Sequence, residues 1–181
     1  MRNIALLTVM EFFLENPYEE FYLRQLAKRL KLSPFAIKKY ADLLIKEEVI
    51  AEERKANLRY FKANTSNLFF RHLKITFNIR SIMQCGLLDF LEQNLANVSA
   101  IVLFGSLAKG ENDRNSDVDI LVIGKERRLR LEEFEEKTGR EITLHVFSWS
   151  EWNAKAKQDK AFYAEIISHG IPLYGELPIV R

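Results

Sequence analysis

The stretch Leu103–Gly124 reads LFGSLAKGENDRNSDVDILVIG, and its pattern decides the fold of the C-terminal part of the chain. Two short apolar runs enclose a polar loop, which predicts one strand over 99–104 and a second over 117–123. A Gly-Ser pair ends the first strand, and the residues after it predict the first turn of a helix or a tight loop. Two aspartates, two residues apart, open the second strand.

Asp117 and Asp119 are expected to point to the same face of their strand, because successive side chains alternate. Val118 and Ile120 then point to the opposite face, which should serve the core. Two close carboxylates repel each other unless a cation lies between them. A magnesium ion fits, because it prefers oxygen ligands and keeps positions open for substrate phosphates.

Gly105 and Ser106 suit a bound phosphate group. Glycine has no side chain, so a phosphate can approach the backbone, and Ser106 offers a hydroxyl and an N–H group to it. A helix that begins here would favour the negative charge at its N-terminus. A carboxylate pair beside a phosphate site predicts phosphoryl-group transfer assisted by a metal ion.

The spacing of these residues resembles a known signature. Gly105-Ser106, ten residues from Leu107 to Ser116, and then Asp117-Val118-Asp119 are similar to the signature of the DNA polymerase beta-like nucleotidyltransferase superfamily. The amino-acid sequence of this stretch is especially similar to that of the minimal nucleotidyltransferases of bacteria and archaea. The resemblance covers roughly residues 97–175.

This resemblance implies an enzyme that transfers a nucleoside monophosphate to an acceptor hydroxyl group and releases pyrophosphate. The donor would be a nucleoside triphosphate, with ATP as the first candidate, bound to magnesium or manganese. Asp117 and Asp119 would be the metal ligands and catalytic carboxylates. Residues that would hold the triphosphate or shape its loop are Gly105, Ser106, Lys109 and Ser116.

One position departs from the family pattern. Active members usually carry a third carboxylate on the next strand, which is expected here over 141–147 after a charged helix over 128–137. Thr143 stands where that acid belongs, and Glu141 is the candidate substitute if the strand shifts. A third carboxylate often activates the acceptor hydroxyl as a base, so its loss weakens transfer more than nucleotide binding.

Residues 1–65 predict three helices followed by a hairpin. The first helix covers Arg2–Glu15 and is stopped by Asn16-Pro17, and the second covers Arg24–Leu30. Ser33 is a good N-cap and Pro34 suits the first helical position, so a third helix starts there. The hairpin strands are expected over 49–54 and 58–63.

This order of elements resembles a winged helix-turn-helix domain, in which the helix after the tight turn enters the DNA major groove. The resemblance implies that Pro34, Phe35, Lys38 and Lys39 face DNA bases or phosphates, and that Arg54, Lys55 and Arg59 in the wing meet phosphates. The alternative is that these cations are solvated surface and that the domain binds a protein.

The whole chain is therefore expected to be α+β. An N-terminal winged helix (1–65) is joined by a helical connector (66–96), with two helices broken near Gly86, to a small mixed-sheet nucleotidyltransferase domain (97–181). The Ser148 region predicts a capping box and another helix.

Composition narrows the class of protein. The 181 residues carry a net charge of +2, and residues 1–65 hold twelve Lys and Arg against nine Asp and Glu. We find no run long enough for a membrane span and no signal-peptide pattern, so a soluble cytoplasmic protein is expected. The single cysteine, Cys85, excludes an intramolecular disulfide.

Two functions from different classes remain open. The first is a nucleotidyltransferase with a DNA-binding winged helix. Relatives of such domains act as antitoxins that modify a partner toxin or as enzymes that modify aminoglycosides, so the acceptor is a protein, such as a cognate toxin, or a small molecule. The second is a DNA-binding transcriptional regulator whose degenerate nucleotidyltransferase-like domain senses nucleotide or forms a homodimer. A purely structural interaction module is a weaker third, because both aspartates and the Gly-Ser pair are kept.

Overall fold

The computed structural model describes residues 4–125 and 127–180. The chain divides into two compact units, Met1–Phe77 and Asn78–Arg181. Both units combine helices with an antiparallel or mixed sheet, so the α+β class is confirmed. Within the described residues, no helix combines the length and apolarity needed to cross a membrane.

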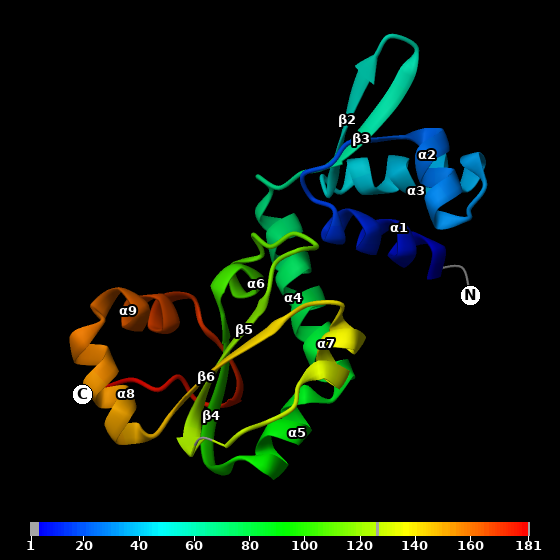
Figure 1. The fold of residues 1–181 in the computed structure, drawn as a ribbon. Helices are drawn as coiled ribbons and strands as arrows, with labels where there is room; N and C mark the ends of the chain where they lie inside the picture. Colours follow the sequence, from blue (N-terminus) through cyan, green and yellow to red (C-terminus); the bar gives the residue numbers. More distant parts are fainter. Residues whose placement is uncertain (1–3, 126, 181) are drawn as a thin grey trace. The chain divides into compact units, whose positions relative to one another are not determined.

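The described part of the first unit contains three helices, the first part of a fourth and a three-stranded sheet, of which Figure 1 labels strands β2 and β3. Its elements are α1 (Ile4–Glu15), β1 (Phe21–Tyr22), α2 (Leu23–Leu30), α3 (Pro34–Lys46), β2 (Ile50–Lys55), β3 (Leu58–Ala63) and the first part of α4 (Leu68–Cys85). The strands lie in the order β1-β3-β2, and both pairs are antiparallel. Residues 2 and 3 of the first expected helix lie outside the described residues.

Local signals place α3 where the sequence predicts it. Pro34 is the first helical residue, and the Ser33 hydroxyl accepts a hydrogen bond of 3.1 Å from the Ala36 N–H. One side of the helix, including Ile37 and Leu44, is buried in the core of this unit. The opposite side is left exposed.

The second unit is built on a four-stranded sheet in the order β6-β5-β4-β7. Its elements after α4 are α5 (Leu87–Asn94), β4 (Ala96–Phe104), α6 (Gly105–Lys109), β5 (Val118–Lys125), α7 (Glu132–Thr138), β6 (Ile142–Phe147), α8 (Trp149–Gln158), α9 (Lys160–His169) and β7 (Ile171–Gly175). Strands β5 and β6 are parallel, whereas β4 is antiparallel to both of its neighbours.

Both faces of this sheet carry a core, which corrects the expectation that only the face of Val118 and Ile120 would be buried. Helices α5 and α7 lie on that face, and α8 and α9 lie on the other (Figure 1). Leu121, which shares the face of Asp119, is fully buried, because Trp152 and Ile166 pack over it. This face is less covered at the two ends of β5, where Asp119 is half-buried and Lys125 is exposed.

Helix α7 begins at Glu132, four residues after the predicted start at 128. Leu129 and Leu131 both pack against the core although they are two residues apart. Residues two apart lie on the same side of an extended segment but on different sides of a helix. The chain therefore stays extended until both leucines have reached the core, and the helix begins after them.

Candidate active site

The motif residues meet where β4 ends and β5 begins. Phe104 is paired with Asp119 across the antiparallel ladder, and Asp119 is paired with Thr143 across the parallel one. Directly paired residues project to the same face of a sheet. Asp119 therefore lies between Phe104 and Thr143 on the face that α8 and α9 cover farther along.

Gly105 lies directly against the Asp119 carboxylate. Its φ is +71°, a conformation that favours glycine, and a Cβ atom there would lie 2.2 Å from Asp119 Oδ2 and 3.1 Å from Asp119 Cγ. The absence of a side chain at Gly105 thus leaves room for the Asp119 carboxylate and also keeps the backbone at the start of α6 accessible.

Asp119 is half-buried and its charge is costly. Burial raises the pKa of Asp119 above its ordinary value of 3.8; His145 opposes this shift, and the negative charge of Asp117 adds to it. Asp117 is exposed and lies one residue before β5. The prediction that the strand begins at Asp117 is therefore wrong by one residue. The negative charge of Asp117 therefore acts on Asp119, and a cation between the two carboxylates would relieve the repulsion.

Glu141, the candidate for the third carboxylate, lies beside the start of β5. Its carbonyl oxygen accepts a hydrogen bond of 2.8 Å from the Val118 N–H. The residue is exposed and borders a hollow shared with acidic residues of α7. No three His, Cys, Asp or Glu residues among those described form a group that could hold a metal ion. Thr143 lies beside Asp119, where the sequence places the missing acid.

Lys109 and Ser116 already have partners. Lys109 Nζ lies 3.2 Å from Glu165 Oε1 of α9. The Ser116 hydroxyl donates to Asp113 Oδ1 over 3.1 Å and accepts from the Asp113 N–H over 3.0 Å. Ser116 therefore shapes the loop between α6 and β5.

Three polar residues that the sequence does not single out support this loop. Asn78 and Asn112 are both buried, and the Asn78 side-chain amide donates to Leu107 O and to Asn112 Oδ1, each over 2.9 Å. Arg140 Nη1 donates to Asp113 O over 2.6 Å and to Ser116 O over 2.7 Å. Their spacing in the sequence carries no signal, because the partners are far apart along the chain.

In the first unit, the predicted DNA contacts of α3 lie on its exposed side. These residues are Pro34, Phe35, Lys38 and Lys39. The Phe35 side chain is unusually open for an apolar residue, with 78% of its surface exposed. Neither lysine forms an ion pair with a carboxylate of the described residues.

The predicted wing cations are held by carboxylates instead. Arg59 Nη2 lies 2.6 Å from both Asp42 Oδ1 of α3 and Glu52 Oε2 of β2, and these contacts raise the pKa of Arg59 and lower that of Glu52. Arg54 also pairs with Glu52. Lys55 pairs with Glu20, which raises the pKa of Lys55.

Comparison with known proteins identifies part of the second unit. Residues 84–167 match the family model described as nucleotidyltransferase domain, and this range includes the Gly-Ser pair and both aspartates. None of the curated proteins compared with the chain matches it. A solved structure described as "Crystal structure of the toxin-antitoxin with AMP-PNP" is similar, with 21% identity over 55% of this chain and 74% of that chain, at a TM-score of 0.38.

Proposed function

We propose that this protein, whose residues 84–167 match the nucleotidyltransferase domain, transfers a nucleoside monophosphate from a nucleoside triphosphate, ATP first among them, to an acceptor hydroxyl group. The observation that carries the proposal is the position of Asp119. Its half-buried carboxylate lies over Gly105 and close to the charge of Asp117, within the matched range. An arrangement that raises the pKa of a carboxylate at a site able to take phosphate suits cation binding.

The donor set fits a magnesium or manganese ion. Such ions are commonly held by one or two carboxylates together with substrate phosphates, and Asp117 and Asp119 offer two. When bound, the ion supplies Lewis-acid polarisation of the phosphoryl group and neutralises charge in the transition state.

The chain's own residues would position the triphosphate. The backbone at Gly105 and the hydroxyl and N–H of Ser106 would bind its phosphates. The acceptor oxygen would attack the α-phosphorus, and the bond from that phosphorus to the bridging oxygen of pyrophosphate would break. Thr143 cannot take the acceptor's proton as a carboxylate would, so we expect slow transfer at a site that binds nucleotide well.

The test is a titration with each nucleoside triphosphate, with and without magnesium, on the wild type and on Asp117→Asn. We expect magnesium-dependent binding that the variant loses, because one of the two carboxylates is gone. Asp89→Asn, an exposed aspartate of α5, is the matched control and should bind like the wild type. Binding that is the same with and without magnesium in all three proteins would contradict the proposal.

A second function is favoured by α3. We propose that the first unit is a winged helix that binds DNA through the exposed side of α3, with Lys38 and Lys39 on phosphates and Phe35 against the bases. Contacts by Arg54, Lys55 and Arg59 would have to compete with the carboxylates that hold them. If transfer is absent, the same unit would serve a regulator whose second unit senses nucleotide or forms a homodimer.

Replacing Lys38 and Lys39 together with Ala should weaken DNA binding at every sequence. The slope of log affinity against log salt concentration should become shallower by about two, because about one counterion is released for each phosphate contact. Fluorescence anisotropy over a salt series measures both quantities. Lys157→Ala with Lys160→Ala, two exposed lysines of the second unit, is the control. Unchanged affinity in the α3 variant would exclude this helix as the DNA contact.

A further inference from the structure

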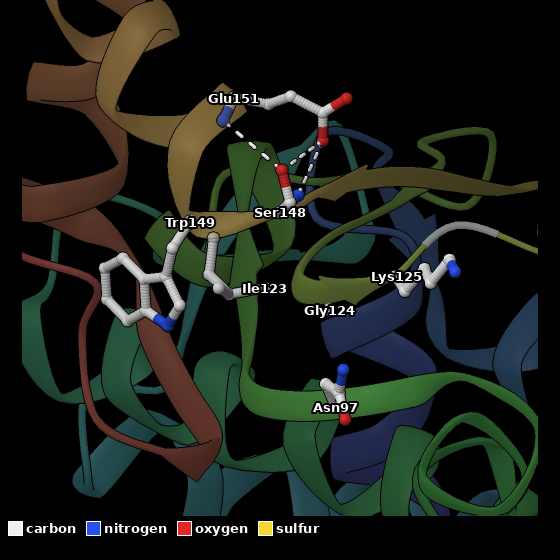
Figure 2. A pocket seen from close by; sticks show the side chains of 7 residues that line it. All are labelled: Asn97, Ile123, Gly124, Lys125, Ser148, Trp149 and Glu151. Carbon is white, nitrogen blue, oxygen red and sulfur yellow. Dashed lines mark hydrogen bonds between the residues drawn. The ribbon is translucent and has the colours of Figure 1, made fainter.

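A cavity of about 520 Å³ is lined by residues at the end of β5 (Figure 2). The aspartates lie at the opposite end of this strand. It is bordered by the start of β4, the end of β5 and the start of α8. Lys125 lies six positions after Asp119 along β5, which corresponds to about 20 Å. On the same face, the fully buried Leu121 lies between Asp119 and the cavity. A molecule in this cavity is therefore distinct from a nucleotide held at Asp117 and Asp119.

An irregularity in β4 forms the floor of the cavity. The register between β4 and β5 shifts between Ala96 and Ala100, and Asn97 within the shift has a φ of +56°. Opposite it, a Cβ atom at Gly124 would lie 3.3 Å from Ala96 O, so the glycine allows the strands to approach. Bulges of this kind redirect side chains beside binding sites, and here the Asn97 side chain borders the cavity (Figure 2).

Trp149 supplies an aromatic wall. Its indole Nε1 donates to Ser99 Oγ over 3.1 Å, which fixes the ring, while 46% of the side chain remains exposed. The other tryptophan of the chain, Trp152, is fully buried and donates to Pro178 O. An ordered, exposed indole face is a surface on which a planar ring can stack.

The charged side chains that line the cavity differ in whether they are free to bind a ligand. Glu151 accepts hydrogen bonds from the Ser148 N–H over 2.8 Å and from its hydroxyl over 2.7 Å, and these bonds lower the pKa of Glu151 (Figure 2). That carboxylate is occupied in the capping box of α8, in which Ser148 is the N-cap residue. The backbone of Lys125 pairs with Ala96 in the sheet. The side chains of Lys125 and Asn97 form no hydrogen bond or ion pair with another described residue, so an ammonium and an amide remain for a ligand.

We propose that this cavity binds a ribonucleoside monophosphate. The base would stack on Trp149, the phosphate would pair with Lys125, and the Asn97 amide would donate to and accept from a polar edge of the base or ribose. The cavity has the size of small-molecule sites, which is about 300 to 1,000 Å³. Its distance from the aspartates makes it a second nucleotide site, separate from that of the transferred nucleotide.

The experiment titrates the full chain with AMP, GMP, CMP, UMP and adenosine. It is done in EDTA and on the Asp117→Asn background, so that the aspartate site does not contribute. Because Trp152 is buried, quenching of tryptophan fluorescence reports on Trp149, and calorimetry gives the affinity independently. We expect at least one monophosphate to quench the fluorescence and to bind more tightly than its nucleoside.

Matched variants identify the groups responsible. Lys125→Gln should weaken monophosphate binding and leave adenosine binding unchanged. Lys157→Gln, at an exposed lysine of α8, should leave the binding of both ligands unchanged. Trp149→Ser should weaken binding by about tenfold or more, as loss of a stacked base does, with thermal unfolding confirming a folded protein. No heat and no quenching with any monophosphate at millimolar concentration would overturn the proposal. Affinity unaffected by both the Lys125 and the Trp149 replacement would also overturn it.

Discussion

Replacing Asp119 with Asn is expected to abolish magnesium-dependent nucleotide binding and to lower transfer by about a hundredfold or more. A bound metal ion supplies several kcal/mol of transition-state stabilisation, and about 1.4 kcal/mol corresponds to a factor of ten in rate. Asn keeps the size of the side chain but removes the charge that the ion needs. Calorimetry with ATP and magnesium, together with release of pyrophosphate, measures the two losses. A variant that binds nucleotide with the magnesium dependence of the wild type would exclude Asp119 as a ligand.

The same substitution is expected to stabilise the protein without ligand at neutral pH. Burial raises the pKa of Asp119 in the folded state above its ordinary value of 3.8. The folded chain therefore holds this proton more tightly than the unfolded chain. The wild type loses stability as the pH rises from the ordinary pKa of the unfolded state through the raised pKa of the folded state. Asn carries no such penalty, so its advantage in urea unfolding should grow from acid to neutral pH. A variant that is less stable than the wild type at neutral pH would contradict the assigned cause.

Replacing Gly105 with Ala is expected to destroy the site while leaving the fold. A left-handed φ of +71° costs a non-glycine residue about 1–2 kcal/mol. The new Cβ would also lie 2.2 Å from Asp119 Oδ2, so the carboxylate has to rotate away. Magnesium-dependent binding should be lost, whereas the free energy of unfolding should fall only by about the backbone cost.

Gly139→Ala is the matched control for this substitution. Gly139 has nearly the same φ, +66°, but nothing lies within 4 Å of a Cβ placed there. The two variants should lose similar stability, and only Gly105→Ala should lose nucleotide binding. If Gly105→Ala binds nucleotide like Gly139→Ala, the contact with Asp119 has no part in the site.

Features set by neighbours along the chain could be predicted from the sequence. The Ser33-Pro34 start of α3 and the Ser148 capping box of α8 depend on residues within one helical turn, and both are confirmed. The strands on either side of the polar loop follow from runs of apolar residues, and they differ from the prediction only at their ends.

Features set by distant partners could not be predicted. The sequence shows Arg59 as a free cation of a hairpin, but Asp42 and Glu52 hold it in the folded chain. The Asn78 and Asn112 pair spans 34 positions and has no pattern to reveal it. That Asp119 lies over Gly105 depends on the pairing of two strands, so the spacing of the motif indicates the chemistry without the contact.

Helix α4 belongs to both units. Phe70 and Phe77, in the first ten residues of the helix, pack in the first core, and Ile79 and Ile82 pack in the second. A gene fragment ending at residue 65 would therefore encode a protein with an apolar surface left bare, and the shortest self-sufficient N-terminal fragment has to extend to Phe77. Recombination at a loop cannot separate the two units as exchangeable cassettes, because the boundary between them falls inside one helix.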